Sequence, residues 1–156
     1  MDVGRLSVYL PMDRRQALAR GHSLPDRTEG AALFADIAGF TRLTERLVAT
    51  LGPRRGAEEL TRLLNAAYDA LIPEVHLYGG SVVGFSGGGF TCWFDRDPGL
   101  RATACGLAMQ RALCPFAVVP IPGGEPVSLS LKVAIASGPV RRFSRTTIRR
   151  PARQPG

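Results

Sequence analysis

The feature that most constrains this chain is an apolar run that ends in a carboxylate, followed by a glycine and a helix start. Residues 31–37 read Ala-Ala-Leu-Phe-Ala-Asp-Ile, and Gly39 comes two residues later. The run is continuous rather than alternating, so it predicts a fully buried β-strand. Thr41 is placed to cap a following helix over residues 41–51, whose leucines share one face.

Asp36 is the candidate metal ligand of this segment. It stands at the predicted strand end, where backbone N–H groups of a turn and a helix N-terminus would point at phosphate oxygens. The pattern therefore predicts a metal–polyphosphate site, and the alternative is that Asp36 only caps the next helix. The candidate phosphate contacts are the backbone groups of Ile37, Ala38, Gly39, Phe40 and Thr41.

The rest of the pattern predicts an α+β chain with the element order β-α-α-β-β-α-β, as in a ferredoxin-like core with an extra helix. Residues 1–29 are polar and predict at most one helix, over residues 13–20. After the first strand and its helix, the spacing of apolar and turn residues predicts the following elements. They are a long helix over 53–78, strands over 81–86 and 90–95 joined by three glycines, a helix over 98–113, a loop over 115–126 and a strand over 127–136.

Residues 34–41 resemble the first metal-binding motif of class III nucleotide cyclases, the adenylyl and guanylyl cyclase catalytic domain, which reads Phe-x-Asp-Ile-x-Gly-Phe-Thr. Residues 56–69 are similar to the long helix of the family, and residues 76–83 to the turn into its second strand. Residues 131–140 are similar to a strand that runs into a small-Gly-x-Val turn. The resemblance covers about two thirds of a cyclase domain and implies its ferredoxin-like fold, incomplete at the C-terminus.

The same resemblance implies an activity and its partners. The family converts a nucleoside triphosphate, ATP by family frequency, to a 3′,5′-cyclic nucleotide and pyrophosphate, in cyclic-nucleotide signalling. It implies Asp36 and Ile37 as ligands of Mg²⁺ or Mn²⁺, and a homodimer or a heterodimer with another cyclase domain, because family sites form at the dimer interface.

Two glycines stand where the family has functional side chains. The family hairpin reads Lys-Phe-x-Gly-Asp-Ala, and residues 84–89 read Gly-Phe-Ser-Gly-Gly-Gly. The purine-reading Lys is thus Gly84, and the second metal-binding Asp is Gly88. Two ions that bridge a triphosphate need oxygen ligands from more than one side. We expect a cyclase that is inactive or impaired as this chain; the alternative is a non-catalytic nucleotide-binding or regulatory module that pairs with an intact cyclase.

The end of the chain departs from the family as well. After residue 140 a cyclase domain continues into a helix whose Asn and Arg stabilise the transition state, whereas residues 141–156 hold six arginines and no acid. Without them the net charge of +7 falls to +1. We expect an N-terminal segment 1–29, a partial cyclase domain 30–140 and a basic, disordered tail 141–156. The tail is a nucleic-acid or membrane arm, a solvated extension or the product of a frameshift near Arg142.

Composition excludes several classes. With 156 residues and 45% hydrophobic content the chain forms one core and one domain. No stretch approaches the ~20 apolar residues of a membrane helix, and no signal peptide is visible, so we expect a soluble, cytoplasmic protein without a membrane or nucleic-acid partner. Three cysteines without a Cys-x-x-Cys pair indicate neither disulfides nor zinc. Asp95 and Asp97 are expected to form a turn rather than a second metal pair, and Lys132 to be a surface charge.

Overall fold

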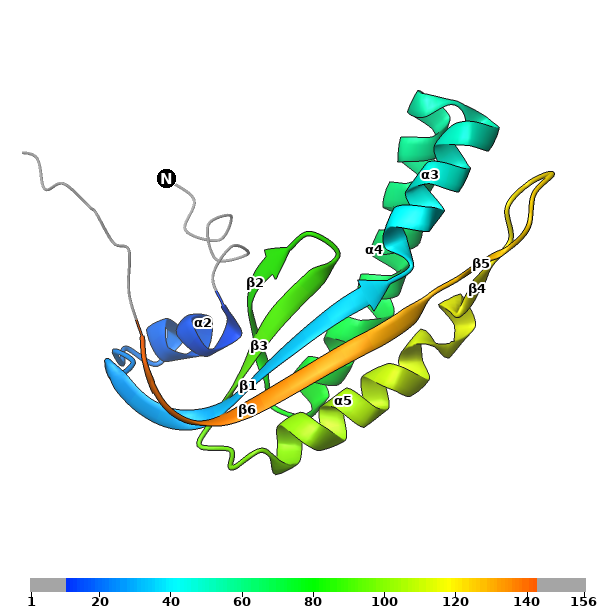
Figure 1. Cartoon of the computed structure of the whole chain (residues 1–156). Helices are drawn as coiled ribbons and strands as arrows, with labels where there is room; N and C mark the ends of the chain where they lie inside the picture. Colours follow the sequence, from blue (N-terminus) through cyan, green and yellow to red (C-terminus); the bar gives the residue numbers. More distant parts are fainter. Residues whose placement is uncertain (1–10, 143–156) are drawn as a thin grey trace, which may run out of the picture.

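The computed structural model describes residues 11–142 and has the expected α+β architecture (Figure 1). The core order β1-α3-α4-β2-β3-α5-β6 confirms the predicted succession of elements. The helices are α2 (Met12–Ala19), α3 (Phe40–Leu51), α4 (Pro53–Leu77) and α5 (Leu100–Leu113), with a 3₁₀ turn at Cys114–Phe116. The strands are β1 (Arg27–Ala38), β2 (Ser81–Ser86), β3 (Gly89–Asp95), β4 (Val118–Val119), β5 (Val127–Ser128) and β6 (Ser130–Arg141).

The main sheet has the order β2-β3-β1-β6, and each neighbouring pair is antiparallel. The central strand β1 sets the register, with Leu33 opposite Cys92 of β3 and opposite Ile135 of β6. A shorter ladder joins β4 to β5. The first strand therefore lies between two partners along most of its length, which fixes where its last residues emerge.

The burial of β1 corrects one prediction. The apolar run is not buried on both sides: Ala31, Leu33 and Ala35 are fully buried, whereas Phe34 between them is 42% exposed. The alternate residues face the opposite side of the sheet because side chains alternate along a strand. Much of that second face is lined by alanines and left open, and it is called the open face below.

The helices α4 and α5 cover the other face of the sheet and form the core with it (Figure 1). Its largest fully buried side chains are Phe90, Phe94, Leu33, Leu43, Leu47, Leu71 and Met109. Helix α3 pairs closely with α4, since a β-carbon on Gly56 would lie 2.9 Å from the backbone of Leu47. This helical pair extends beyond the sheet at the end where β1 leads into α3 (Figure 1).

Several local predictions need correction. Thr41 does not cap α3: the residue before the helix is Gly39, in the left-handed region with φ of 96°, and no side chain caps it. The strand expected over 127–136 is split into β5 and β6 at Leu129, whose N–H donates to the carbonyl of Ala117. The expected loop over 115–126 contains β4.

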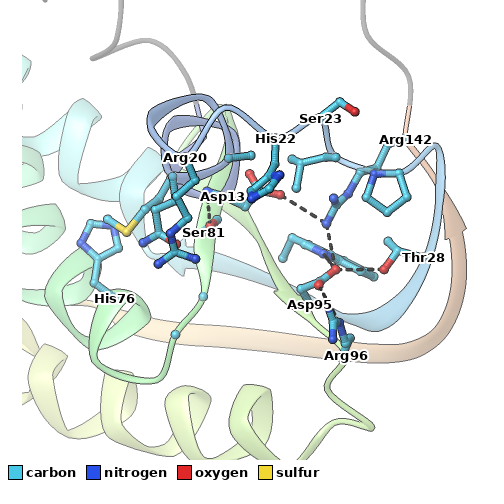
Figure 2. Close-up of a pocket in the computed structure, with 18 residues that line it drawn as sticks. Asp13, Arg20, His22, Ser23, Thr28, His76, Ser81, Asp95, Arg96 and Arg142 are labelled. Atoms are coloured by element: carbon cyan, nitrogen blue, oxygen red, sulfur yellow. Dashed lines mark hydrogen bonds and ion pairs between the residues drawn. The ribbon is translucent and has the colours of Figure 1, made fainter.

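Helix α2 packs at the opposite end of the sheet from α3. The backbone N–H of Asp13 donates to Ser81 Oγ on β2 (2.8 Å), and the helix borders a pocket on this side of the molecule (Figure 2). The sequence predicted this helix with its bounds shifted by one residue, but not its packing. No helix among residues 11–142 is long and apolar enough to cross a membrane. The basic tail, apart from Arg141 and Arg142, lies outside the described residues.

Candidate functional site

Asp36 lies two residues before the end of β1, and its side chain shares the open face with Phe34. It is half-buried, and its cross-strand neighbours are Gly89 on β3 and Lys132 on β6. Lys132 is exposed, as expected for a surface charge. The register also places its side chain on the same face of the sheet as the Asp36 carboxylate. The strand therefore delivers one carboxylate to the rim of the sheet, beside the start of α3.

The turn after β1 depends on Gly39. A β-carbon there would collide with the carbonyl oxygen of Ser128, and the positive φ also disfavours any other residue. Helix α3 starts at Phe40, and its first intrahelical bond runs from the N–H of Leu43 to the carbonyl of Gly39. The N–H groups of Phe40 and Thr41 thus belong to the first helical turn, where backbone donors have no acceptor within the helix. These are the groups that a phosphate could engage.

The backbone group of Ile37 that is available to a ligand is its carbonyl and not its N–H. Its N–H donates to the carbonyl of Gly88 in the adjoining hairpin (3.3 Å), so that donor is already used. The carbonyl oxygen of Ile37 points toward the same hairpin and would lie 3.8 Å from a β-carbon on Gly88. Ile37 is therefore placed to offer an oxygen ligand to a cation next to Asp36, while its N–H is not available to a phosphate.

The hairpin between β2 and β3 brings Gly88 directly to Asp36. A β-carbon on Gly88 would lie 3.9 Å from Asp36 Oδ1 and would meet nothing closer than 3.8 Å. The next residue, Gly89, is different, since a β-carbon there would lie 2.7 Å from the carbonyl oxygen of Ala35. Position 88 thus has room for a side chain aimed at Asp36. Gly84 is equally open, with no atom within 4 Å of the position of a β-carbon.

Two oxygen atoms near the end of β1 could serve as ligands of a cation. They belong to the carboxylate of Asp36 and the carbonyl of Ile37, and no group of three or more His, Cys, Asp or Glu side chains that could hold a metal occurs among residues 11–142. Mg²⁺ is commonly held by only one or two carboxylates, with waters and substrate phosphates completing its octahedron. These two donors could hold one ion only with further ligands from water or a bound phosphate, and they lack the second carboxylate of a two-ion site.

Asp97, which could be mistaken for a metal ligand, stabilises the start of α5. It is 2% exposed, and its carboxylate accepts the backbone N–H groups of Arg101 (3.1 Å) and Ala102 (2.8 Å). Burial alone would raise the pKa of Asp97, but the N–H donors of Ala102, Arg101 and Gly99 outweigh it and hold the pKa below its usual value. Asp97 thus lies in the connection between β3 and α5, as expected, whereas Asp95, expected in the same turn, is the last residue of β3.

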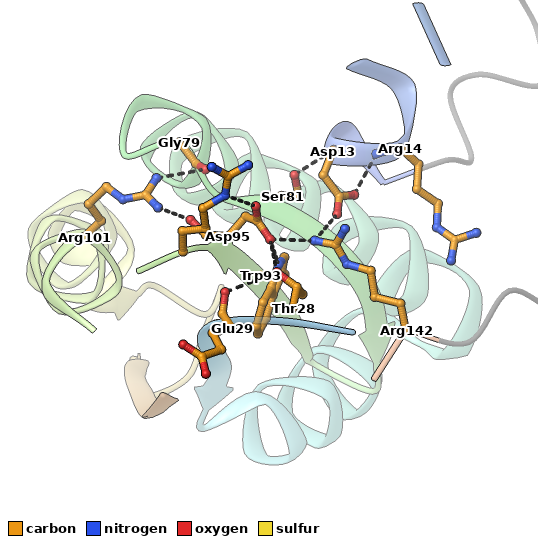
Figure 3. Close-up of polar contacts among 11 residues, drawn as sticks. Asp13, Arg14, Thr28, Glu29, Gly79, Ser81, Trp93, Asp95, Arg101 and Arg142 are labelled. Atoms are coloured by element: carbon orange, nitrogen blue, oxygen red, sulfur yellow. Dashed lines mark hydrogen bonds and ion pairs between the residues drawn. The ribbon is translucent and has the colours of Figure 1, made fainter. Parts of the chain in front are cut away.

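Asp95 belongs to a polar cluster (Figure 3), and it pairs with Gly30 near the start of β1, whereas Asp36 lies near the end of that strand. Asp95 Oδ1 accepts hydrogen bonds from Thr28 Oγ1 (2.9 Å), Trp93 Nε1 (3.3 Å) and Arg142 Nη2 (2.9 Å). Burial pushes its pKa upward, but these donors and the charge of Arg142 prevail, so the pKa lies below the usual range. No local sequence pattern marks this cluster, because its members come from β1, from β3 and from the residue after β6, which lie far apart along the chain.

An aromatic cluster beside the hairpin was also missed. Tyr68 of α4 stacks edge-on against Phe85 (5.5 Å between ring centroids) and Phe90 (5.9 Å). Burial raises the pKa of the Tyr68 hydroxyl, and the negative charge of Asp36 adds to the effect. The cluster holds the β2–β3 hairpin against α4, so it fixes the position of Gly88 relative to Asp36.

Comparisons with known proteins agree with this geometry. No protein-family model matches the chain. Adenylate cyclase type 10 from Homo sapiens is 33% identical over 88 residues, 53% of this chain and 5% of the relative. Among solved structures, the adenylyl cyclase CyaB from P. aeruginosa is 26% identical with a TM-score of 0.56, over 72% of this chain and 57% of that one. The guanylyl cyclase Cya2 is 26% identical with a TM-score of 0.55, over 78% and 61%.

The chain spans only about 5% of the length of the curated relative that it matches. The fold and the aligned segments nevertheless agree on one family. This chain carries part of a class III nucleotide cyclase domain.

Proposed function

We propose that this cyclase domain binds a nucleoside triphosphate, ATP by family frequency, with one Mg²⁺ or Mn²⁺ ion, and turns it over poorly or not at all as this chain. The single observation that supports the proposal is the pairing of Asp36 with Gly88. One carboxylate stands at the strand tip, and the position facing it, although open to a side chain, has none. A cation can be held there, but the ligand set for a second ion is incomplete.

The missing carboxylate bears directly on the cyclisation step. In that reaction the ribose 3′-oxygen loses its proton and attacks the α-phosphorus, while the bond to the departing pyrophosphate breaks. Negative charge grows on the attacking and leaving oxygens, and two cations stabilise both in a two-ion site. Asp36 and the Ile37 carbonyl would hold one cation, and the first-turn N–H groups of α3 would bind phosphate oxygens. This arrangement favours binding over turnover.

Gly84 indicates that the purine base of a bound nucleotide would also be held weakly. Its β-carbon position is open, so nothing in the fold prevents a lysine there, yet the residue offers no donor to a purine. A bound nucleotide would therefore be held through its phosphates and metal more than through its base. We expect weak discrimination between ATP and GTP.

A second candidate function is regulation of an intact cyclase by pairing with it. The observation that favours it is the open face of the sheet, where Phe34 is 42% exposed and Ala134 lies opposite it on β6. The family assembles its sites between two domains, so a second cyclase domain is the partner that this face suits. In such a pair the present chain would supply the Asp36 half of the site.

Titration calorimetry with Mn²⁺ and a non-hydrolysable ATP analogue tests the binding proposal. We expect saturable binding to the wild-type chain and at least a tenfold loss in the Asp36→Asn variant, since a hydrogen bond or ligand contact to a charged group is worth about 1.5–3 kcal/mol. Glu45→Gln, which removes the same charge from an exposed position on α3, is the matched control. Equal binding by wild type and Asp36→Asn would refute the proposed site.

Chromatography of the reaction products tests the other half of the proposal. We expect no cyclic nucleotide from the chain alone with Mn²⁺ and ATP. The regulatory function predicts that adding the chain to an intact class III cyclase domain changes the rate of that enzyme. Rapid product formation by the chain alone would contradict impaired turnover.

A further inference from the structure

A pocket lies between α2, the segment after it and the far end of the sheet, away from Asp36 (Figure 2). Its volume is about 450 Å³, within the range of small-molecule sites. Met12, Ala17, Leu24 and Trp93 supply apolar lining, whereas basic side chains supply the charge. The pocket therefore combines an apolar floor with positive groups.

Arg142 supplies a donor that no described residue satisfies. Its Nη2 is engaged by Asp95 Oδ1 (2.9 Å) and Asp13 Oδ2 (3.4 Å), whereas its Nη1 is buried without a hydrogen-bond partner among residues 11–142. Asp95 cannot serve Nη1 easily, because its Oδ1 already accepts three hydrogen bonds and its Oδ2 faces Arg96 (3.5 Å). A buried charged donor without an acceptor is costly, so it favours an acceptor brought by a ligand.

Further hydrogen-bond donors border the same pocket. Arg20 follows the C-terminus of α2 and has no acidic partner among the described residues, and His22 and His76 border the pocket with it (Figure 2). The two acids in the lining, Asp13 and Asp95, are both engaged by Arg142. The charged groups that remain available, Arg20 and Nη1 of Arg142, are therefore donors, and they come from the end of α2 and from the residue after β6.

We propose that this pocket binds a small phosphorylated molecule, with its phosphate between Arg20 and Arg142 Nη1 and its organic part against Trp93. A phosphate offers acceptors on several sides, which suits donors that arrive from two elements, and guanidinium groups recognise it well. The volume is that of a small-molecule site rather than a single-ion site, and the apolar lining has no use in binding a bare ion. The ligand is thus a phosphate ester rather than free inorganic phosphate.

The site is separate from the Asp36 region, and the proposal does not depend on the proposed cyclase function. A ligand there would bridge α2, β3 and the end of β6, since Asp13 lies on α2, Trp93 on β3 and Arg142 directly after β6. It would therefore fasten α2 to the sheet, which gives the ligand a way to change the stability of this end of the domain.

Calorimetric titration of the full chain with phenyl phosphate tests the proposal, with EDTA present so that no metal-dependent binding at Asp36 contributes. We expect saturable binding, and weaker binding of inorganic phosphate, which lacks the apolar part. Arg20→Gln should weaken binding of phenyl phosphate by at least about fivefold, because it removes a charged donor. Arg15→Gln, an exposed arginine of α2 outside the pocket lining, should change it by less than twofold.

A second pair of variants tests the location without altering charge. Ala17→Trp fills the pocket and should abolish binding, whereas Ala19→Trp on the exposed side of α2 should leave it intact. Circular dichroism confirms that each variant keeps the wild-type fold. No saturable binding of phenyl phosphate, or binding that survives both Arg20→Gln and Ala17→Trp, would overturn the proposal. Tighter binding of inorganic phosphate than of the ester would overturn its choice of ligand.

Discussion

Replacement of Gly88 by Asp should have opposite effects on stability without and with a divalent metal. The new β-carbon would lie 3.9 Å from Asp36 Oδ1, so the two carboxylates could approach each other to about 4 Å. At that separation two like charges repel by about 1 kcal/mol in water and by about 4 kcal/mol near a protein surface. Since Asp36 is half-buried but reaches solvent, we expect a loss of about 1–2 kcal/mol in the unfolding free energy without metal.

Mn²⁺ should reverse that loss. The ion would lie between Asp36, the new carboxylate and the carbonyl oxygen of Ile37, which is 3.8 Å from the position of the new β-carbon. Relief of 1–2 kcal/mol of repulsion alone corresponds to a gain of about 5- to 30-fold in Mn²⁺ affinity. The added oxygen ligand increases it further. The variant should therefore be the less stable protein in EDTA and the more stable one in Mn²⁺.

Urea denaturation in EDTA and in Mn²⁺ measures both effects, and calorimetry gives the affinity. Gly88→Asn is the matched control, because it adds a side chain of the same shape without the charge. Backbone effects common to both replacements then cancel. If Gly88→Asp and Gly88→Asn have the same stability in EDTA and the same affinity for Mn²⁺, position 88 does not face Asp36 as described. Supplying the C-terminal half of a cyclase domain to Gly88→Asp should restore some turnover.

Other predictions concern the scaffold. Asp97→Ala should lower the unfolding free energy by about 1 kcal/mol in urea, because α5 loses its N-terminal acceptor; in the wild type this contribution should be complete above the ordinary Asp pKa of 3.8 and be lost as the pH falls below it. Gly80→Ala should cost about 1–3 kcal/mol, since its β-carbon would lie 2.6 Å from the Phe94 ring, while the open Gly84→Ala should change stability by less than about 0.5 kcal/mol. In the native chain a thiol reagent should modify Cys114 quickly and the two buried thiols only after unfolding, because burial raises their pKa to about 12; rapid modification of all three would contradict the core.

Most of the core order of elements could be predicted from the sequence because its signals are local. Gly52 with Pro53, and Gly79 with Gly80, mark helix ends, and the three glycines at 87–89 mark a hairpin, so the positions of α4, β2 and β3 follow from neighbouring residues. The bounds of β6 were missed since β-pairing with β1, not local pattern, carries that strand to Arg141. Strand partners far along the chain decide such limits.

The burial of β1 shows where a local pattern misleads. Alanine fits both a buried position and a bare sheet face, so the run 31–37 reads as continuously apolar although alternate residues face the open side. The cap of α3 was wrong for a related reason. Thr41 is a good capping residue in isolation, but Gly39 takes the left-handed conformation that brings the turn against the Ser128 carbonyl, and this moves the helix start to Phe40.

The candidate site could be predicted in part. The motif around Asp36 identified the carboxylate, and the hairpin motif identified Gly88 as the residue that would face it, in agreement with the 3.9 Å separation. The use of the Ile37 N–H by the Gly88 carbonyl could not be read from the motif, because it depends on strand register. The phosphate pocket was out of reach for the same reason, as Asp13, Asp95 and Arg142 meet only after the sheet has formed.

A thermal melt of the full chain with and without millimolar Mn²⁺ and a non-hydrolysable ATP analogue tests the central claim most directly. A ligand that binds only the folded state at ten times its Kd adds about 1.4 kcal/mol of stability, which corresponds to about 3–6 °C in Tm for a chain of this size. The account predicts a cooperative melt that moves upward by this amount in the wild type and stays in place in Asp36→Asn. No shift in the wild type, or an equal shift in Asp36→Asn, would contradict a metal–nucleotide site at the end of β1.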